Sequence, residues 1–222
     1  MRAAFMGGLG VLALAAALPG TTAGSIGFSV VLFAGAAAMA GRFLQRDYHH
    51  DRLGLCNYVT LARLMLVCAL SAHLLTGGGP SWAFFGLAVI ALSLDGVDGW
   101  LARKQGLTSE FGARFDVEVD SLLALTLAIN AALTPEIGAA ALLLGIPRYA
   151  FIAASYALPW MQRDLPERFS RKVVCVLQLA ALIAMQAPLL PATIAIALVP
   201  LVAVALVWSF ALDIVWLRRS RS

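Results

Sequence analysis

Charged side chains are scarce in this sequence. Only 13% of its 222 residues are Asp, Glu, Lys or Arg, while 61% are hydrophobic, and the mean hydropathy is +0.88. A typical soluble domain has about 25% charged residues, so this composition excludes a sizeable soluble domain. Apolar runs long enough to span a bilayer, about 17–25 residues each, recur along the whole chain. The sequence therefore predicts an all-α fold, a polytopic membrane helical bundle.

Cysteine and histidine are also rare, with three of each. The cysteines, Cys56, Cys68 and Cys175, show neither CxxC nor zinc-site spacing, which argues against a zinc centre or a disulfide framework. We interpret them as small apolar packing residues. The basic residues are not interleaved with aromatic ones in a pattern typical of nucleic-acid binding, so no nucleic-acid partner is predicted.

About eight transmembrane spans are predicted. On one side they are joined by short links that are rich in turn residues and carry no Lys or Arg, namely PGTTAGS, TGGGPS, TPE and APLLP. The links on the other side are longer and basic. The spans lie at about residues 3–18, 26–42, 57–76, 81–102, 112–134, 137–157, 173–187 and 191–216.

The basic residues predict the orientation of the chain. Of its sixteen Lys and Arg, only Arg63 and Arg148 lie inside apolar runs, and all the others fall at one face. The positive-inside rule places that face and both termini in the cytoplasm. We expect an integral protein of a bacterial inner (cytoplasmic) membrane, whose basic face attracts anionic membrane lipids. Residues 3–18 could instead be a signal peptide, because this segment is short and small residues follow it.

Four aspartates lie at the ends of two neighbouring predicted spans, in the stretch DGVDGWLARKQGLTSEFGARFDVEVD. Asp95 and Asp98 are three residues apart, and Asp116 and Asp120 are four apart, so each pair projects from one face of its helix. The short link makes the two helices antiparallel neighbours, and both pairs can then point into one cavity. We expect cations there, because four carboxylates repel one another and are costly near the membrane.

The chemistry of the four carboxylates favours hard divalent cations. Their oxygens suit Mg²⁺ or Mn²⁺, and two such ions fit a substrate with phosphates, most simply a diphosphate. Gly99, Ala102 and Gly112 lie nearby and leave room for a ligand, although small residues also serve close helix packing. The alternatives for the aspartates are a solvated loop or salt bridges to Arg103, Lys104 and Arg114.

The same stretch resembles the signature of the CDP-alcohol phosphotransferase (CDP-alcohol phosphatidyltransferase) family, D-x2-D-G-x2-A-R-x8-G-x3-D-x3-D. NYVTLARL is similar to the N-x2-T-x2-R start of the first core helix of this family, and supplies Asn57, Thr60 and Arg63. The resemblance implies a six-helix core, here residues 51–222, after a two-helix membrane extension at residues 1–50. The eight fixed positions of the signature are filled by Asp95, Asp98, Gly99, Ala102, Arg103, Gly112, Asp116 and Asp120.

The resemblance also implies a reaction, in which a phosphatidyl group passes from CDP-diacylglycerol to a small alcohol and CMP is released, as in phospholipid biosynthesis. It implies two divalent cations, Mg²⁺ or Mn²⁺, held by Asp95, Asp98, Asp116 and Asp120, with Asp120 also as the general base. A homodimer is implied as well. The residues that the resemblance assigns to CDP binding are Gly99, Ala102, Arg103, Gly112, Asn57 and Thr60.

The signature does not identify the acceptor, which in this family is glycerol phosphate, inositol phosphate, serine, phosphatidylglycerol, choline or ethanolamine. Arg148 lies inside an apolar span, where an unpaired charge is costly, so we expect it to face the cavity and bind a phosphate. Arg114 and Arg63 are further candidates for acceptor or phosphate binding. Glycerol 3-phosphate is therefore our first choice. The basic residues that could gather at the same face, or merely anchor it, are Arg163, Arg168, Arg171 and Lys172.

Two other classes of protein stay open. A cation-binding transporter could also place carboxylates in a membrane cavity, but its site would lie near the midplane of the bilayer rather than near one face. A catalytically inactive scaffold is the second alternative. The intact set of eight signature residues argues against it, because a scaffold would lose nothing when one of them changed.

Overall fold

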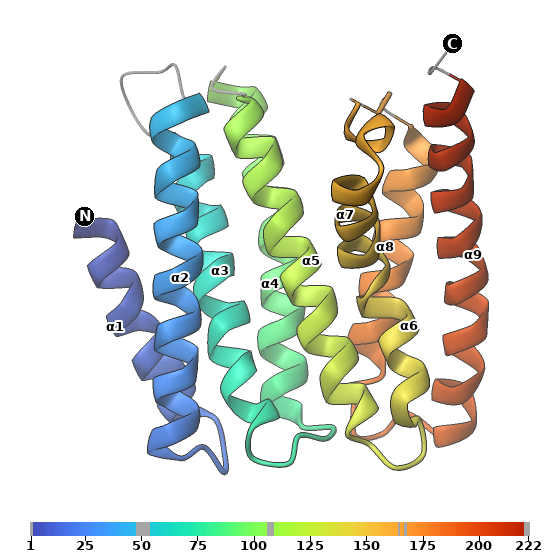
Figure 1. The fold of residues 1–222 in the computed structure, drawn as a ribbon. Coiled ribbons are helices and arrows are strands. Elements are labelled where there is room, and N and C mark those ends of the chain that lie inside the picture. Colours follow the sequence, from blue (N-terminus) through green and yellow to red (C-terminus); the bar gives the residue numbers. More distant parts are fainter. Residues whose placement is uncertain (1, 48–53, 106–108, 164, 167, 220–222) are drawn as a thin grey trace.

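The chain forms a bundle of helices, described by a computed structural model over residues 2–47, 54–105, 109–163, 165–166 and 168–219 (Figure 1). No strand occurs among these residues, which confirms the predicted all-α fold. The elements are α1 (Arg2–Ala17), α2 (Ala23–Asp47), α3 (Leu55–Leu74), α4 (Trp82–Gln105), α5 (Glu110–Ala132), the 3-10 turn η1 (Gly138–Ala141), α6 (Leu142–Gly145), α7 (Pro147–Ala157), the 3-10 turn η2 (Pro159–Gln162), α8 (Phe169–Ala184) and α9 (Ala192–Arg219).

Every predicted span overlaps a helix, but the helices differ in length and polarity. Among the described residues, α2, α3, α4 and α9 are long and apolar enough to cross a membrane by themselves. The bent pair formed by η1–α6 and α7 would make a fifth span. The helices α1 and α8 have only 16 residues each, and α5 carries several charged residues in its first half. The polytopic membrane bundle expected from composition is confirmed in this form.

The predicted span 137–157 is two helices rather than one continuous helix. The segments Gly138–Gly145 and Pro147–Ala157 meet at an angle of 55°. Proline has no amide hydrogen and its ring clashes with the preceding turn, so Pro147 favours a bend or break at this point. Gly145, just before the bend, lets α6 approach the backbone of α5, because an added Cβ there would lie 3.1 Å from Leu125 Cα.

The central element is α3, which packs against α1, α2, α4 and α5. It is the most enclosed of the four long apolar helices. Leu64, Val67 and Leu70 of α3 are buried in the main core together with Leu123 and Leu127 of α5. This packing places α3 beside the two helices that carry the aspartates, so its polar residues can reach them.

A buried amide network fixes the edge of the bundle where α3 turns into α4. Asn130 of α5 donates to the carbonyl oxygen of Gly79 and accepts from its amide, each at 3.0 Å. The same Asn130 donates to Gln186 Oε1 at 2.7 Å, and Gln186 donates to carbonyl oxygens of α5 and α8 at 3.1 and 2.8 Å. The turn needs glycine, since Gly77–Gly79 all have positive φ. The network joins three elements at the edge opposite the aspartates.

The basic residues gather at the other edge of the bundle. The C-terminal ends of α2, α4 and α9 and the N-terminal ends of α5 and α8 lie together at the upper edge in Figure 1. The basic residues of these helix ends include Arg42, Arg114, Arg171 and Arg218. This arrangement agrees with a single basic face, and its orientation toward the cytoplasm stays a prediction.

Candidate active site

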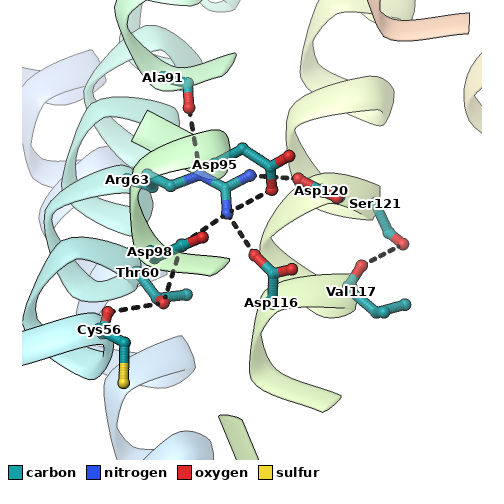
Figure 2. Close-up of polar contacts among 10 residues, drawn as sticks. All are labelled: Cys56, Thr60, Arg63, Ala91, Asp95, Asp98, Asp116, Val117, Asp120 and Ser121. Atoms are coloured by element: carbon teal, nitrogen blue, oxygen red, sulfur yellow. Dashed lines mark hydrogen bonds and ion pairs between the residues drawn. The ribbon is translucent and has the colours of Figure 1, made fainter. Parts of the chain in front are cut away.

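The four aspartates of α4 and α5 come together around one side chain of α3. Asp95 and Asp98 face α5, and Asp116 and Asp120 face α4, with Arg63 between them (Figure 2). One carboxylate oxygen from each of Asp95, Asp98 and Asp116 lies within 4.8 Å of the other two. Asp98 is buried, and the other three aspartates are half-buried. The four aspartates therefore form the shared cluster that the sequence predicted, and they meet because α4 and α5 both pack against α3.

Arg63 forms an ion pair with each of the four aspartates. Its Nη1 atom lies 2.9 Å from Asp95 Oδ1 and 3.1 Å from Asp98 Oδ2, and also contacts Asp116 Oδ1. Its Nη2 atom pairs with Asp120 Oδ1. The side chain of Arg63 has no exposed surface. This arrangement was not predicted from the sequence, although a lone cation in an apolar run, three residues after Thr60, was a signal for it.

Two of the predicted CDP-binding residues lie on α3 beside the cluster. Thr60 Oγ1 is 3.1 Å from Asp98 Oδ2, and Asn57 is buried one turn earlier in the helix. Gly112 of α5 lies next to them, since an added Cβ there would come 3.5 Å from Asn57 Oδ1. Ser109 caps α5 by accepting a hydrogen bond from the Gly112 amide at 3.0 Å. These contacts bring Asn57, Thr60 and Gly112 together at the end of the aspartate cluster.

The remaining CDP-binding candidates lie in α4. Gly99 directly follows Asp98 and is half-buried. Ala102 and Arg103 belong to the last turns of the same helix, and their side chains lie outside the described part of the structure. Their role in CDP binding stays a prediction.

Arg148 and Arg114, the other two arginines predicted to bind phosphate, pair with glutamates. Arg148 Nη2 is 2.8 Å from Glu118 Oε1. Because Glu118 is two residues from both Asp116 and Asp120, it projects from a different face of α5, about 200° around the helix. Arg148 therefore pairs with a carboxylate outside the aspartate cluster, and its role in phosphate binding stays a prediction. Arg114 is exposed, and its Nη2 lies 3.9 Å from a carboxylate oxygen of Glu110.

A second buried ionic cluster joins α8 to α9. Asp213 of α9 is only 3% exposed. Its Oδ1 is 3.1 Å from Arg168 Nη1, and its Oδ2 is 3.4 Å from Arg171 Nη1. Arg168 Nη2 is buried and has no hydrogen-bond partner among the described residues. Two arginines on one carboxylate leave one excess positive charge. This cluster was not predicted from the sequence, where its signal was a lone aspartate in the last apolar span.

The aspartate cluster has the geometry and chemistry of a site for a hard divalent cation. Mg²⁺ binds oxygen ligands at about 2.0–2.1 Å, so two ligands on opposite sides of the ion are about 4.2 Å apart. The oxygens of Asp95, Asp98 and Asp116 are compatible with this spacing. All three donors are carboxylate oxygens, which Mg²⁺ and Mn²⁺ prefer. The residues present therefore fit such a cation.

Comparisons with known proteins agree with the geometry. Residues 53–215 match the family described as CDP-alcohol phosphatidyltransferase. Two proteins of Mycobacterium tuberculosis, from strains CDC 1551 / Oshkosh and ATCC 25618 / H37Rv, are each 34% identical to this chain over 122 residues. Both are named "Probable phosphatidylglycerophosphate synthase", and the match covers 46% of this chain and 57% of each relative. The chain thus spans little more than half the length of these curated relatives. No solved structure matches.

Proposed function

Because this chain belongs to the CDP-alcohol phosphatidyltransferase family, we propose that it transfers a phosphatidyl group from CDP-diacylglycerol to a small alcohol and releases CMP. The single observation that carries the proposal is the meeting of four aspartates from two helices around one buried arginine. Carboxylates in this number suit a reaction at a diphosphate, where divalent cations balance the charge of the substrate.

The metal ligands in this proposal are the aspartates. Asp95, Asp98 and Asp116 hold one cation, which the spacing of their oxygens supports. Asp120, one turn further along α5, joins them to hold a second. Bound Mg²⁺ or Mn²⁺ would neutralise the diphosphate and stabilise the negative charge on the departing CMP.

Asp120 also acts as the general base. It takes the proton from the acceptor hydroxyl, whose oxygen forms a bond to the phosphorus that carries diacylglycerol. The bond from that phosphorus to the bridging oxygen of the diphosphate breaks, and CMP leaves with the electron pair. The position of Asp120 supports this role, because it reaches the cluster from one turn beyond the Asp95, Asp98 and Asp116 triplet.

The cytidine diphosphate of the donor binds beside the aspartates. The contact of Thr60 with Asp98 and the closeness of Gly112 to Asn57 support this location. Gly112 leaves room for a ligand near the backbone of α5. The other members of this proposed site, all in α4, are Gly99, Ala102 and Arg103.

Glycerol 3-phosphate is the proposed acceptor. The printed name of the two mycobacterial relatives supports it, since phosphatidylglycerophosphate is the product of that acceptor. The excess positive charge of Arg168 and Arg171 around Asp213 also supports an acceptor with a phosphate. Arg148, on α7, is a further candidate for the same anion. Choline, serine and ethanolamine have no phosphate for these arginines to bind.

We also propose a location for the protein and leave its assembly as a prediction. We propose an inner membrane of a bacterium, with the aspartates at the cytoplasmic face, supported by the basic residues at that edge of the bundle. The division into an extension at residues 1–50 and a core at 51–222, and the homodimer implied by the family, stay predictions. Light scattering on the purified protein would measure the number of copies.

One assay tests the proposed function. Purified protein is incubated with labelled CDP-diacylglycerol, Mg²⁺ and one of glycerol 3-phosphate, inositol phosphate, serine or choline, and released CMP is measured. We expect release with glycerol 3-phosphate, reversible loss with a chelator, and no release from Asp98→Asn. The matched control is Glu136→Gln, an exposed carboxylate at the opposite edge, which should keep full activity.

The outcomes of this assay distinguish a wrong acceptor from a wrong reaction class. Release of CMP with another alcohol alone would show that the acceptor is wrong but the reaction class is right. No release with any alcohol, from folded protein supplied with Mg²⁺, would contradict the reaction itself.

A further inference from the structure

Arg63 is a permanent, fully buried cation inside the cluster that is proposed to bind metal. Its Nε atom donates to the carbonyl oxygen of Ala91 in α4 at 3.1 Å, which ties the guanidinium to the backbone on one side. Its two Nη atoms point to the carboxylates on the other side (Figure 2). Because no part of the side chain reaches the surface, it has little freedom to leave the cluster. Its surroundings favour an interaction with the aspartates over direct contact with an acceptor.

The ion pairs of Arg63 involve one oxygen from each carboxylate. They are Oδ1 of Asp95, Asp116 and Asp120, and Oδ2 of Asp98. A carboxylate has two oxygens and about four lone-pair sites, so each aspartate can serve a second cation through its other oxygen. Arg63 and a divalent ion can therefore share the same four side chains.

The charges in the cluster explain why a positively charged side chain is needed to hold the four aspartates together before a metal ion binds. Four ionised aspartates carry four negative charges, and Arg63 reduces the sum to three. Like charges at this separation repel one another, and more strongly at a partly buried site than in bulk water. A divalent ion, however, is also repelled by the guanidinium while it is attracted by the aspartates. Arg63 should thus stabilise the metal-free cluster and weaken metal binding at the same time.

From this geometry we propose that Arg63 is a positioning residue, which holds the four aspartates together by its charge in the absence of metal and competes with divalent cations for them. The inference rests on the proposed metal site and adds a second role for its ligands. A bound metal would weaken the ion pairs between Arg63 and the aspartates, and these ion pairs would strengthen again when the metal dissociates. The four aspartates then stay converged in both states.

Metal affinity in the absence of substrate tests the proposal. Mn²⁺ binding to detergent-purified protein is measured by the electron paramagnetic resonance signal of free Mn²⁺. We expect Arg63→Met to bind Mn²⁺ at least about tenfold more tightly than the wild type, because a nearby positive charge is gone. Arg63→Lys keeps the positive charge and should bind within about threefold of the wild type. Arg218→Met, an exposed arginine on α9, is the matched control and should leave the affinity unchanged.

Equal or weaker Mn²⁺ binding by Arg63→Met would overturn the inference, while the proposed metal site would still stand. Absence of Mn²⁺ binding to the wild type would instead contradict the metal site itself.

Thermal unfolding in a chelator provides the second measurement. Without metal, Arg63→Met should unfold at a lower temperature than the wild type, because four carboxylates face one another without a counter-charge. The double variant R63M/D120N returns the cluster to three negative charges and should recover part of the lost stability. No recovery would show that Arg63 stabilises the site by its shape and not by its charge, and would refute the proposal.

Discussion

Asp116 and Asp120 are one helical turn apart on α5, yet their partners differ. Asp116 belongs to the triplet of closely spaced carboxylates with Asp95 and Asp98. Asp120 is joined to the cluster through the other terminal nitrogen of Arg63. This difference suits a division of labour, in which Asp116 chiefly binds metal and Asp120 also moves a proton.

Asp120→Asn should separate proton transfer from metal binding. The amide keeps the size and shape of the side chain but cannot accept the proton of the acceptor hydroxyl. We expect CDP-diacylglycerol to bind with near-normal affinity and turnover to fall by about 10²–10⁴, the usual contribution of a general base. Donor binding and the single-turnover rate are measured on the same variant at several Mg²⁺ concentrations.

Excess Mg²⁺ distinguishes the two roles of Asp120. If it restores the rate of Asp120→Asn, the side chain was chiefly a metal ligand and the assignment as base is wrong. Asp116→Asn is the matched comparison, because its donor affinity should fall together with its rate.

The four aspartates could be predicted from the sequence. Arg63 stood out there as a lone cation in an apolar run, but its contact with all four aspartates could not be predicted. Helical periodicity is local, so spacings of three and four residues suffice to place each pair on one face. The partner of the aspartates depends on how α3 packs between α4 and α5, and no local pattern contains that information. The same holds for the pair of Arg148 with Glu118, whose residues are thirty positions apart. Long-range ion pairs of this kind follow from packing alone.

At the scale of elements, hydropathy predicted where the helices lie, but it did not predict that the span 137–157 consists of two helices. Each apolar run became helical because backbone groups in lipid must be satisfied within the segment. Pro147 marks the position of the break, but a proline alone does not predict one, because α9 continues through Pro200. The buried amide network of Asn130 and Gln186 was also not predicted, because the sequence does not show that two amides in separate apolar spans will contact each other when the helices pack.

Asn130→Leu should destabilise the bundle without touching the aspartates. The substitution removes three hydrogen bonds and leaves the buried Gln186 amide and the backbone of Gly79 without this partner. A buried polar group left unsatisfied costs about 1–3 kcal/mol, so the midpoint of thermal unfolding in detergent should fall clearly.

Ser93→Ala is the control for this loss. Ser93 is exposed and donates to the carbonyl of Val89 in its own helix, so the loss of its hydroxyl should change stability by less than about 0.5 kcal/mol. An unfolding midpoint of Asn130→Leu equal to that of Ser93→Ala would show that the buried amide network contributes nothing to stability.

Asp213 links α9 to Arg171 of α8 and to Arg168, which precedes that helix. Its loss should affect one substrate. In Asp213→Asn a neutral amide can no longer hold both Arg168 and Arg171, which should then turn away from the position proposed for the acceptor phosphate. We expect the KM for glycerol 3-phosphate to rise about tenfold, the equivalent of one lost charged hydrogen bond, with little change in the KM for CDP-diacylglycerol. Steady-state kinetics with each substrate varied in turn provide the measurement.

Asp213→Glu is the matched control, because it keeps the charge and should retain most of the affinity for the acceptor. A similar rise in both KM values in Asp213→Asn would point to a general loss of packing between α8 and α9.

At the scale of the whole molecule, the two edges of the bundle have opposite character. One edge carries the arginines at the helix ends, and the other carries turns rich in glycine and proline. Lys and Arg near helix ends are retained in the cytoplasm during insertion. The edge with the aspartates should therefore face the cytoplasm, where a nucleotide-linked donor would be made.

Cysteine labelling tests this orientation. In a background without Cys56, Cys68 and Cys175, single cysteines are placed at Leu189, an exposed residue of the link between α8 and α9, and at Arg218, an exposed residue near the end of α9. The two positions lie at opposite ends of α9, so they should lie on opposite sides of the membrane. A membrane-impermeant maleimide should label Leu189→Cys in intact spheroplasts and Arg218→Cys only after lysis. The reverse pattern would place the aspartates on the outer side, away from any cytoplasmic supply of CDP-diacylglycerol, and would contradict both the orientation and the proposed access of the donor.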